Sequence, residues 1–349
     1  MINDSQKAFL TLVKAGLWEK EAKLLRFGKI DFAAISVMAD AQGVTGLLAV
    51  GLEHADVKPS LDRVMSIVGK AMKIERQNKA QNLFVEETVK KMREAGINIL
   101  LVKGQGVAQC YERPLWRASG DVDFLLGPDH YKKAIEFLQP LSSSNKPEER
   151  YSRHLGMKIG ELLVEVHGSL RTGLSARVDR EVDAVQKDVL YGGKVRSWNN
   201  GSVQVLLPAP NEDVFLVFTH FIKHFYKGGM SLRQVCDWCR LLWTYRSDIK
   251  TDWLGQHLRK AGLMKEWRTF AALAVDFLGM PAEAMPIYDS RFKVKDSQLM
   301  ELVLRGCSGN KIRDTWRIAK IFPWKALHYS PSIFLNVNLM KVKERLFIC

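Results

Sequence analysis

The sequence has no long apolar run, and this absence limits the classes of protein it can encode. Its 349 residues are 47% hydrophobic and 26% charged, a composition typical of folded domains and not of disordered chains. A membrane-spanning helix needs about 18 unbroken apolar residues. The best candidate, residues 214–226, is interrupted by His220, Lys223 and His224. We therefore expect a globular protein that is not integral to a membrane.

Cysteines are few, and the chain start has no secretion signal. Five cysteines, an odd number without framework spacing, fit a reducing compartment. The first residues include Asp4 and lack the basic start, apolar block and small-residue cleavage site of a signal peptide. These features predict a cytoplasmic protein.

Two of the cysteines, Cys236 and Cys239, form a C-x-x-C that a redox or zinc site would also contain. The pair lies in a helical pattern in which both positions face the core. No second cysteine pair or histidine pair follows at zinc-finger spacing. The pattern therefore favours a structural role.

Acidic residues are fewer than basic ones, 38 against 52, which leaves a formal charge of +14. Part of this excess lies in residues 311–345, which contain eight basic and two acidic residues. Trp316, Phe322, Trp324 and Tyr329 are interleaved with them. This composition suits stacking on bases, an anionic membrane surface or a groove of another protein. A solvated helical face whose aromatic side chains pack inward is the favoured interpretation.

Hydrophobic periodicity predicts an α+β fold, with a small mixed sheet flanked by helices, a helical N-terminal leader and a helical C-terminal domain. Residues 5–92 have helical periodicity, which returns beyond residue 214. Strands are expected at 97–102, 121–126, 154–159 and 162–167, with a short edge strand at 203–207. The strands at 154–159 and 162–167 should form a hairpin with a two-residue turn at Gly160-Glu161, and residues 140–149 should form a polar loop. The expected units are the leader 1–94, the core 95–208, a helical domain 209–310 and the basic, aromatic segment 311–349.

Acidic side chains alternate with apolar ones on two of these strands. Asp121 and Asp123 leave one face of their strand, as Glu165 and His167 do on a later one. Like charges so close repel unless a cation lies between them. Three carboxylates are suitable ligands for Mg2+ in two-metal phosphoryl transfer. A D-x-D on a solvated strand face is the plainer alternative.

A glycine-rich turn precedes the acids. Lys103, Gly104, Gln105 and Gly106 follow the first strand, where backbone amides can bind phosphate. A tight turn closed by a solvated lysine is an equally weighted interpretation. Arg113 and Arg117 follow, and a guanidinium there can bind phosphate or hold a carboxylate in place.

Taken together, these residues resemble the nucleotidyltransferase superfamily of the DNA polymerase beta type. The most similar branch is the nucleotidyltransferase family often called NTP-transferase type 5. The resemblance spans about residues 5–245, including residues 30–48 of the leader and a helical stretch from His220 to Asp237. Its motif consists of Lys103-Gly104, Tyr111, Pro114, Arg117, Gly120-Asp121-Val122-Asp123 and Glu165-Val166-His167.

The resemblance implies transfer of a nucleoside monophosphate from an NTP to an acceptor hydroxyl. It implies that Asp121, Asp123 and Glu165 bind Mg2+ or Mn2+, and that Glu165 activates the hydroxyl. The NTP would lie against Lys103, Gly104, Gln105, Gly106, Arg117, Gly120 and His167. The Gly-Ser usual in the superfamily is Gly104-Gln105 here, so the amides of Gln105 or Gly106 would replace the serine contact.

The favoured acceptor is a small molecule, such as a sugar-like polyol. A protein hydroxyl or an RNA 3' end is the alternative, as is a binding protein that keeps the fold without catalysis and uses the basic segment for nucleic acid. His220 and His224 lie on one helical face at a spacing that permits metal binding, although a hydrogen-bonded pair is favoured. Arg233 and Asp237 lie four residues apart and could pair with each other.

Overall fold

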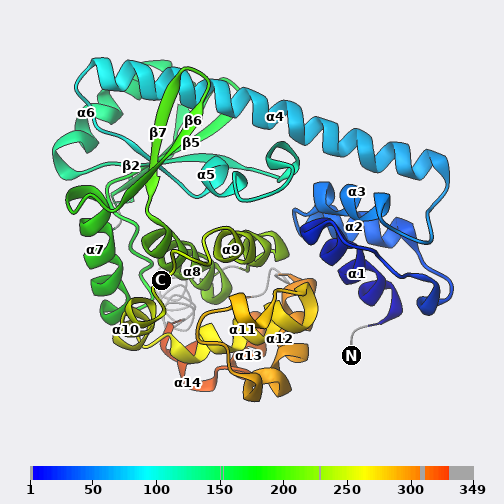
Figure 1. Cartoon of the computed structure of the whole chain (residues 1–349). Coiled ribbons are helices and arrows are strands. Elements are labelled where there is room, and N and C mark those ends of the chain that lie inside the picture. The colour runs from blue at the N-terminus through cyan, green and yellow to red at the C-terminus, as the bar shows by residue number, and fades with distance from the viewer. Residues whose placement is uncertain (1–2, 150, 152, 228, 307–310, 330–349) are drawn as a thin grey trace, which may run out of the picture.

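The computed structural model describes residues 3–149, 151, 153–227, 229–306 and 311–329. It confirms an α+β fold, in which a five-stranded mixed sheet and a two-stranded sheet are surrounded by helices (Figure 1). Five short 3-10 helices complete the elements: Leu25–Phe27, Pro114–Trp116, Gln139–Leu141, Ala282–Ala284 and Ser290–Phe292.

Four helices form the leader, as predicted: α1 (Asp4–Trp18), α2 (Phe32–Ala41), α3 (Thr45–Glu53) and α4 (Leu61–Glu94). Asp31 caps α2 by accepting hydrogen bonds from the backbone N–H groups of Ala33 and Ala34, both at about 3 Å. Helix α4 is 34 residues long and runs from the α1–α3 group across the sheet (Figure 1). It therefore joins the leader to the sheet as one rigid element.

The main sheet has the strand order β1-β2-β5-β4-β3. Its strands are β1 (Leu100–Val102), β2 (Asp121–Leu125), β3 (Ser144–Asn145), β4 (His154–Ile159) and β5 (Leu162–His167). Strands β2 and β5 are parallel, and the other neighbours are antiparallel. The predicted hairpin with its turn at Gly160-Glu161 is confirmed. The short edge strand β3 lies in a stretch that was expected to be a polar loop.

The two faces of β2 and β5 have different surroundings. Val122, Phe124, Val164 and Val166 are fully buried in a core that they share with α4 and α6 (Pro128–Leu138). The alternate positions, which include Asp123 and Glu165, lie on the opposite face. The period-2 pattern thus leaves one face of the sheet apolar and the other acidic.

Residues 203–207 do form a strand, but its expected place at the edge of the main sheet is wrong. Strand β7 (Val203–Pro208) pairs with β6 (Val195–Asn200) in a separate two-stranded antiparallel sheet. Strand β6 was not predicted, because its sequence, Val-Arg-Ser-Trp-Asn-Asn, has little apolar alternation. The buried side chains of β7 pack into the same core as α4 and α6.

Helices form the remainder of the described chain. They are α7 (Ala176–Tyr191), α8 (Pro210–Lys227), α9 (Leu232–Thr244), α10 (Thr251–Ala261), α11 (Met264–Leu278), α12 (Lys293–Arg305), α13 (Lys311–Ala319) and α14 (Pro323–Tyr329). Helix α7 was not predicted. Helices α8 and α9 lie beside the acidic face of the sheet, and α11–α14 pack beyond them (Figure 1). In the described ranges, no helix combines the length and apolar character that crossing a bilayer would require.

Cys236 and Cys239 are fully buried in the helical core, as the structural interpretation predicts. In the basic segment, Phe322 and Tyr329 are also buried, while Trp316 and Trp324 are 58% and 83% exposed. Two of the four aromatic side chains of this segment therefore pack into the protein, and the other two are exposed to solvent. Residues 330–349 of this segment, with Lys341, Lys343 and Arg345, lie outside the described residues.

Candidate active site

Three carboxylates lie together on the acidic face of the main sheet. Asp123 on β2 is directly opposite Glu165 on β5, and Asp121 precedes Asp123 on the same face. Ligand oxygens of Asp121, Asp123 and Glu165 all lie within 4.8 Å of one another. The parallel pairing of β2 and β5 thus brings together acids that are more than forty residues apart in the sequence.

The donor set fits a hard divalent cation. The carboxylate of Asp121 has no hydrogen-bond or ion-pair partner among the described side chains. Burial raises the pKa of Asp121, and the negative charge of Asp123 raises it further. A cation bound between the carboxylates would remove this repulsion, and Mg2+ and Mn2+ both prefer oxygen ligands. Asp121, Asp123 and Glu165 are therefore the residues that would hold it.

Asp123 is the most enclosed of the three acids, with 2% of its surface exposed. Lys103 Nζ donates to its Oδ1 at 2.8 Å, and His167 Nε2 lies at the same distance from that oxygen. Burial alone would raise the pKa of Asp123, but the charge of Lys103 and the contact with His167 hold it below its usual value. Lys103 has a positive φ of 58°, and this left-handed backbone connects β1 to the turn beside the acids.

Sequence reasoning missed His154 on β4. Its ring stacks on that of His167 with centroids 4.6 Å apart, and its Nε2 lies 3.0 Å from Glu165 Oε2. A signal for it existed, because the two-residue turn of the predicted hairpin sets the register that places His154 opposite His167. Burial would raise the pKa of Glu165, but the close contacts with His154 and His167 hold it far below its usual range.

Gln105 and Gly106 do not face the acids as expected. The Gln105 side chain turns toward α4, where its Nε2 donates to Asn78 and Gln81 at 2.7 Å. A side-chain atom added at Gly106 would lie 2.7 Å from Leu207, so Gly106 provides close packing against β7. Of the turn residues, Lys103 and Gly104 line the cavity above the acids. The phosphate contact expected from the backbone amides of Gln105 or Gly106 stays a prediction.

Arg117 lines the cavity but is already paired. Its Nε and Nη2 each donate to the carboxylate of Asp237 at 2.7 Å, and Tyr111 Oη donates to the same carboxylate at 2.8 Å. Burial would raise the pKa of Asp237, but Arg117 keeps it below its usual value. Asp237 therefore pairs with Arg117 and not, as the spacing suggested, with Arg233. The pair of Arg117 and Asp237 holds the loop after α5 (Gly104–Ala108) against α9.

Two other residues that the sequence suggested for the site do not line the cavity. Arg113 forms ion pairs with Glu53 and Glu19 at the surface, 2.6 and 3.2 Å away, and does not line the cavity. Gly120 is exposed, has no neighbour where a side chain would begin, and precedes Asp121 without lining the cavity.

The acids form one wall of a cavity of about 560 Å3. Helix α8 provides the opposite wall through His220, Lys223 and His224, and α9 adds Arg233. The two histidines contact each other, with their Nε2 atoms 3.1 Å apart. Burial lowers the pKa of His224 to about 4, and the nearby Lys223 adds to this shift, so the pair is neutral at pH 7. The hydrogen-bonded interpretation of the pair is confirmed, and both rings also face the cavity.

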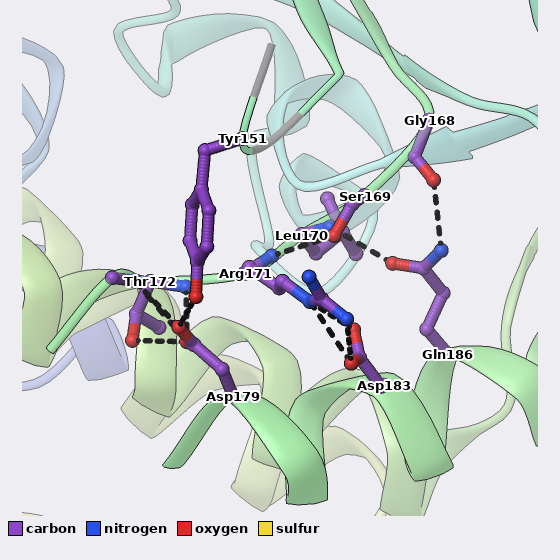
Figure 2. Close-up of polar contacts among 10 residues, drawn as sticks. Tyr151, Gly168, Ser169, Leu170, Arg171, Thr172, Asp179, Asp183 and Gln186 are labelled. Atoms are coloured by element: carbon purple, nitrogen blue, oxygen red, sulfur yellow. Dashed lines mark hydrogen bonds and ion pairs between the residues drawn. The ribbon is translucent and has the colours of Figure 1, made fainter. Parts of the chain in front are cut away.

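The loop that follows β5 forms a further wall through Ser169, Leu170 and Arg171. Figure 2 shows how α7 holds this loop. Gln186 accepts a hydrogen bond from the Leu170 N–H and donates to the Gly168 carbonyl. Asp179 accepts bonds from the backbone of residues 172 and 173, and from Tyr151 Oη at 2.9 Å. Arg171 is paired with Asp183 at 2.6 Å. The loop is thus rigidly positioned beside the acids.

No curated protein and no solved structure matches the chain significantly. The family described as "uncharacterised nucleotidyltransferase" matches residues 28–279, more than two thirds of the sequence. The matched region contains the three carboxylates, the turn at Lys103, the loop held by α7 and both helices of the opposite wall. The resemblance seen in the sequence is therefore confirmed, and the chain belongs to this nucleotidyltransferase family.

Proposed function

We propose that the protein transfers a nucleoside monophosphate from an NTP to a hydroxyl group of a small-molecule acceptor and depends on Mg2+ or Mn2+. The observation that carries this proposal is the placement of Asp121, Asp123 and Glu165 within 4.8 Å of one another in the wall of a cavity. When bound there, divalent ions would neutralise the triphosphate and lower the pKa of the acceptor hydroxyl.

In this reaction, the acceptor oxygen attacks the α-phosphorus. A new P–O bond forms, the bond to the β-phosphate oxygen breaks, pyrophosphate leaves and the hydroxyl proton is released. The chain's own residues position these groups. Lys103 and His167 fix the orientation of the Asp123 carboxylate, and His154 and His167 fix that of Glu165. Asp123 and Glu165 are thus held in one geometry before any substrate arrives.

The size and walls of the cavity support a small acceptor. About 560 Å3 is within the usual range of ligand pockets, roughly 300–1,000 Å3, and α8 closes the side opposite the acids. The loop at Ser169 and Arg171 is held by α7, so it forms a fixed wall. A folded protein or a structured RNA would need a more open approach to Glu165.

The direct test is to incubate the protein with Mg2+, each of four α-labelled NTPs and a small-molecule extract. We expect a labelled product and released pyrophosphate. Asp121→Asn, Asp123→Asn and Glu165→Gln should each lower the rate by about 100-fold or more, because each weakens a ligand of the ions that would neutralise the charge on the transferring phosphoryl group.

Glu161→Gln is a matched control, since Glu161 lies at the tip of the same hairpin with 95% of its side chain exposed. It should retain the wild-type rate. Equal rates in all four variants and the wild type would refute the proposed site. Label that appears only in macromolecules would instead assign the acceptor to that class.

A further inference from the structure

The sheet side of the cavity provides little free positive charge for a triphosphate. Lys103 is already bonded to Asp123, and Gln105 points toward α4. Helix α5 has five residues, and its N-terminus alone is not a sufficient anion site. Arg117 is neutralised by Asp237, and Arg171 by Asp183. If an NTP binds over the acids, most of the compensating charge has to come from another wall.

Two cations on the helical side line the cavity without an acidic partner. Lys223 of α8 makes no hydrogen bond or ion pair with any described residue, and its side chain lies among the neutral His220 and His224. Arg233 of α9 donates only to the Ala118 carbonyl, at 3.0 Å, and has no carboxylate within ion-pair distance in the described part of the chain.

The surroundings of the Lys223 and Arg233 side chains disfavour a positive charge that has no anionic partner. Burial lowers the pKa of Lys223, and repulsion from Lys103 lowers it further. Burial likewise lowers the pKa of Arg233, with Arg117 adding repulsion. A lysine or arginine that only stabilised the fold would usually have an acidic partner at such a site. An anionic ligand would provide the missing one.

We propose that Lys223 and Arg233 bind the polyphosphate of the NTP from the helical side, opposite the carboxylates on the sheet. This inference rests on the proposed function and deepens it. It assigns the phosphate-binding role to α8 and α9 in place of the glycine-rich turn. The triphosphate then lies between an acidic wall with its metal ligands and a cationic wall, so each wall acts on a different part of the same substrate.

The test uses the full-length protein with Mg2+ and the α,β-methylene analogues of ATP and GTP, which bind without transfer. Affinity is measured by calorimetry for each triphosphate analogue and for the matching nucleoside monophosphate. In Lys223→Gln and Arg233→Gln, triphosphate affinity should fall at least about tenfold, the loss typical of one charged hydrogen bond. Monophosphate affinity should change much less, so the ratio of the two affinities falls.

Charge-matched controls separate this role from a general effect on the protein. Lys132→Gln removes a lysine that is 86% exposed on α6 and should leave the ratio unchanged. Lys223→Arg and Arg233→Lys keep the charge and should recover much of the lost affinity. An unchanged ratio in both glutamine variants would overturn the proposal, even if both proteins bind all nucleotides more weakly.

Failure of the proposal and failure of the proposed function give different results. If the wild-type protein binds neither analogue, the measurement is extended to the α,β-methylene analogues of CTP and UTP; if it binds none of the four, an NTP is not its substrate, and both ideas fail together. If the wild type binds an analogue and the glutamine variants bind it with the wild-type affinity ratio, nucleotidyl transfer stands and the role of Lys223 and Arg233 is wrong.

Discussion

The substitution Asp237→Asn should destabilise the fold strongly, although it removes only a charge. Asp237 and Arg117 are each 5% exposed and share two hydrogen bonds of 2.7 Å. The variant would leave the Arg117 guanidinium buried without a counter-charge. Breaking one side of a buried ion pair typically costs about 3–5 kcal/mol in the free energy of unfolding. We expect a loss in that range at pH 7, measured by urea unfolding.

Asp121→Asn is the matched control, because it makes the same chemical change at an acid that has no partner among the described residues. In metal-free buffer it should leave stability unchanged or raise it by about 1 kcal/mol, since it removes repulsion from Asp123. The double variant Asp237→Asn with Arg117→Met should recover part of the loss, because no unpaired charge then remains buried.

The pH dependence provides a second check on the same reasoning. The pKa of Asp237 is lowered in the folded state, where the pull of Arg117 outweighs the effect of burial. The ion pair of Asp237 therefore contributes fully to the free energy of unfolding above the pKa of an aspartate in the unfolded chain. This contribution is lost as the pH falls through the lower pKa that Asp237 has in the folded state. The advantage of the wild type over Asp237→Asn should shrink in acid. If Asp237→Asn lowers the free energy of unfolding by less than about 1 kcal/mol at pH 7, that result refutes the argument. A difference in this free energy between the wild type and the variant that does not change with pH would also refute it.

Three further outcomes are expected. Gly46→Ala should lower the urea midpoint, because the new carbon would lie 1.9 Å from the Trp116 carbonyl oxygen. Its control is Gly69→Ala, at an exposed position of α4 with no neighbour within 4 Å, which should stabilise the protein by about 0.5–1 kcal/mol. Gln105→Ala should destabilise by about 1–3 kcal/mol, since it leaves buried partners unpaired, yet should not change the affinity for a nucleotide analogue in calorimetry. Glu165→Gln should weaken Mn2+ binding detected by electron paramagnetic resonance at least about tenfold, and equal binding would remove Glu165 from the ligand set.

The elements that could be predicted from the sequence are those specified by local patterns. The alternation around Asp121 and Glu165 identified two strands and the face on which their acids lie. A two-residue turn identified the hairpin that contains β4 and β5. These signals extend over a few residues, and burial of one face makes a shift in register costly. For this reason the three carboxylates could be placed on one surface before their distances were known.

The predictions that failed depend on contacts between distant parts of the chain. The sequence could not show that the Gln105 side chain bonds to Asn78 and Gln81 of α4, more than twenty residues earlier, which leaves only its backbone amide for the predicted phosphate contact. Arg233 and Asp237 have ideal helical spacing, yet Asp237 pairs with Arg117, 120 residues away. Strand β6 lacks a clear pattern because its pairing with β7 supplies its stability. Local spacing identifies possible partners, and the tertiary structure selects among them.

The charges in the cavity are compatible with the proposal that this strongly basic chain binds both metal and nucleotide. Its ion-paired arginines are neutralised by their own partners, as Arg117 is by Asp237. Lys103, Lys223 and Arg233 then match the three carboxylates in number, so the cavity is close to neutral despite the +14 of the whole chain. In the proposed reaction, divalent ions held by the three carboxylates would neutralise the part of the triphosphate nearest the sheet, and Lys223 and Arg233 would neutralise the remainder. In this proposal, the arrangement of the charges, with acids on the sheet and cations on α8 and α9, would orient the substrate, and the net charge of the whole chain would contribute little to binding it.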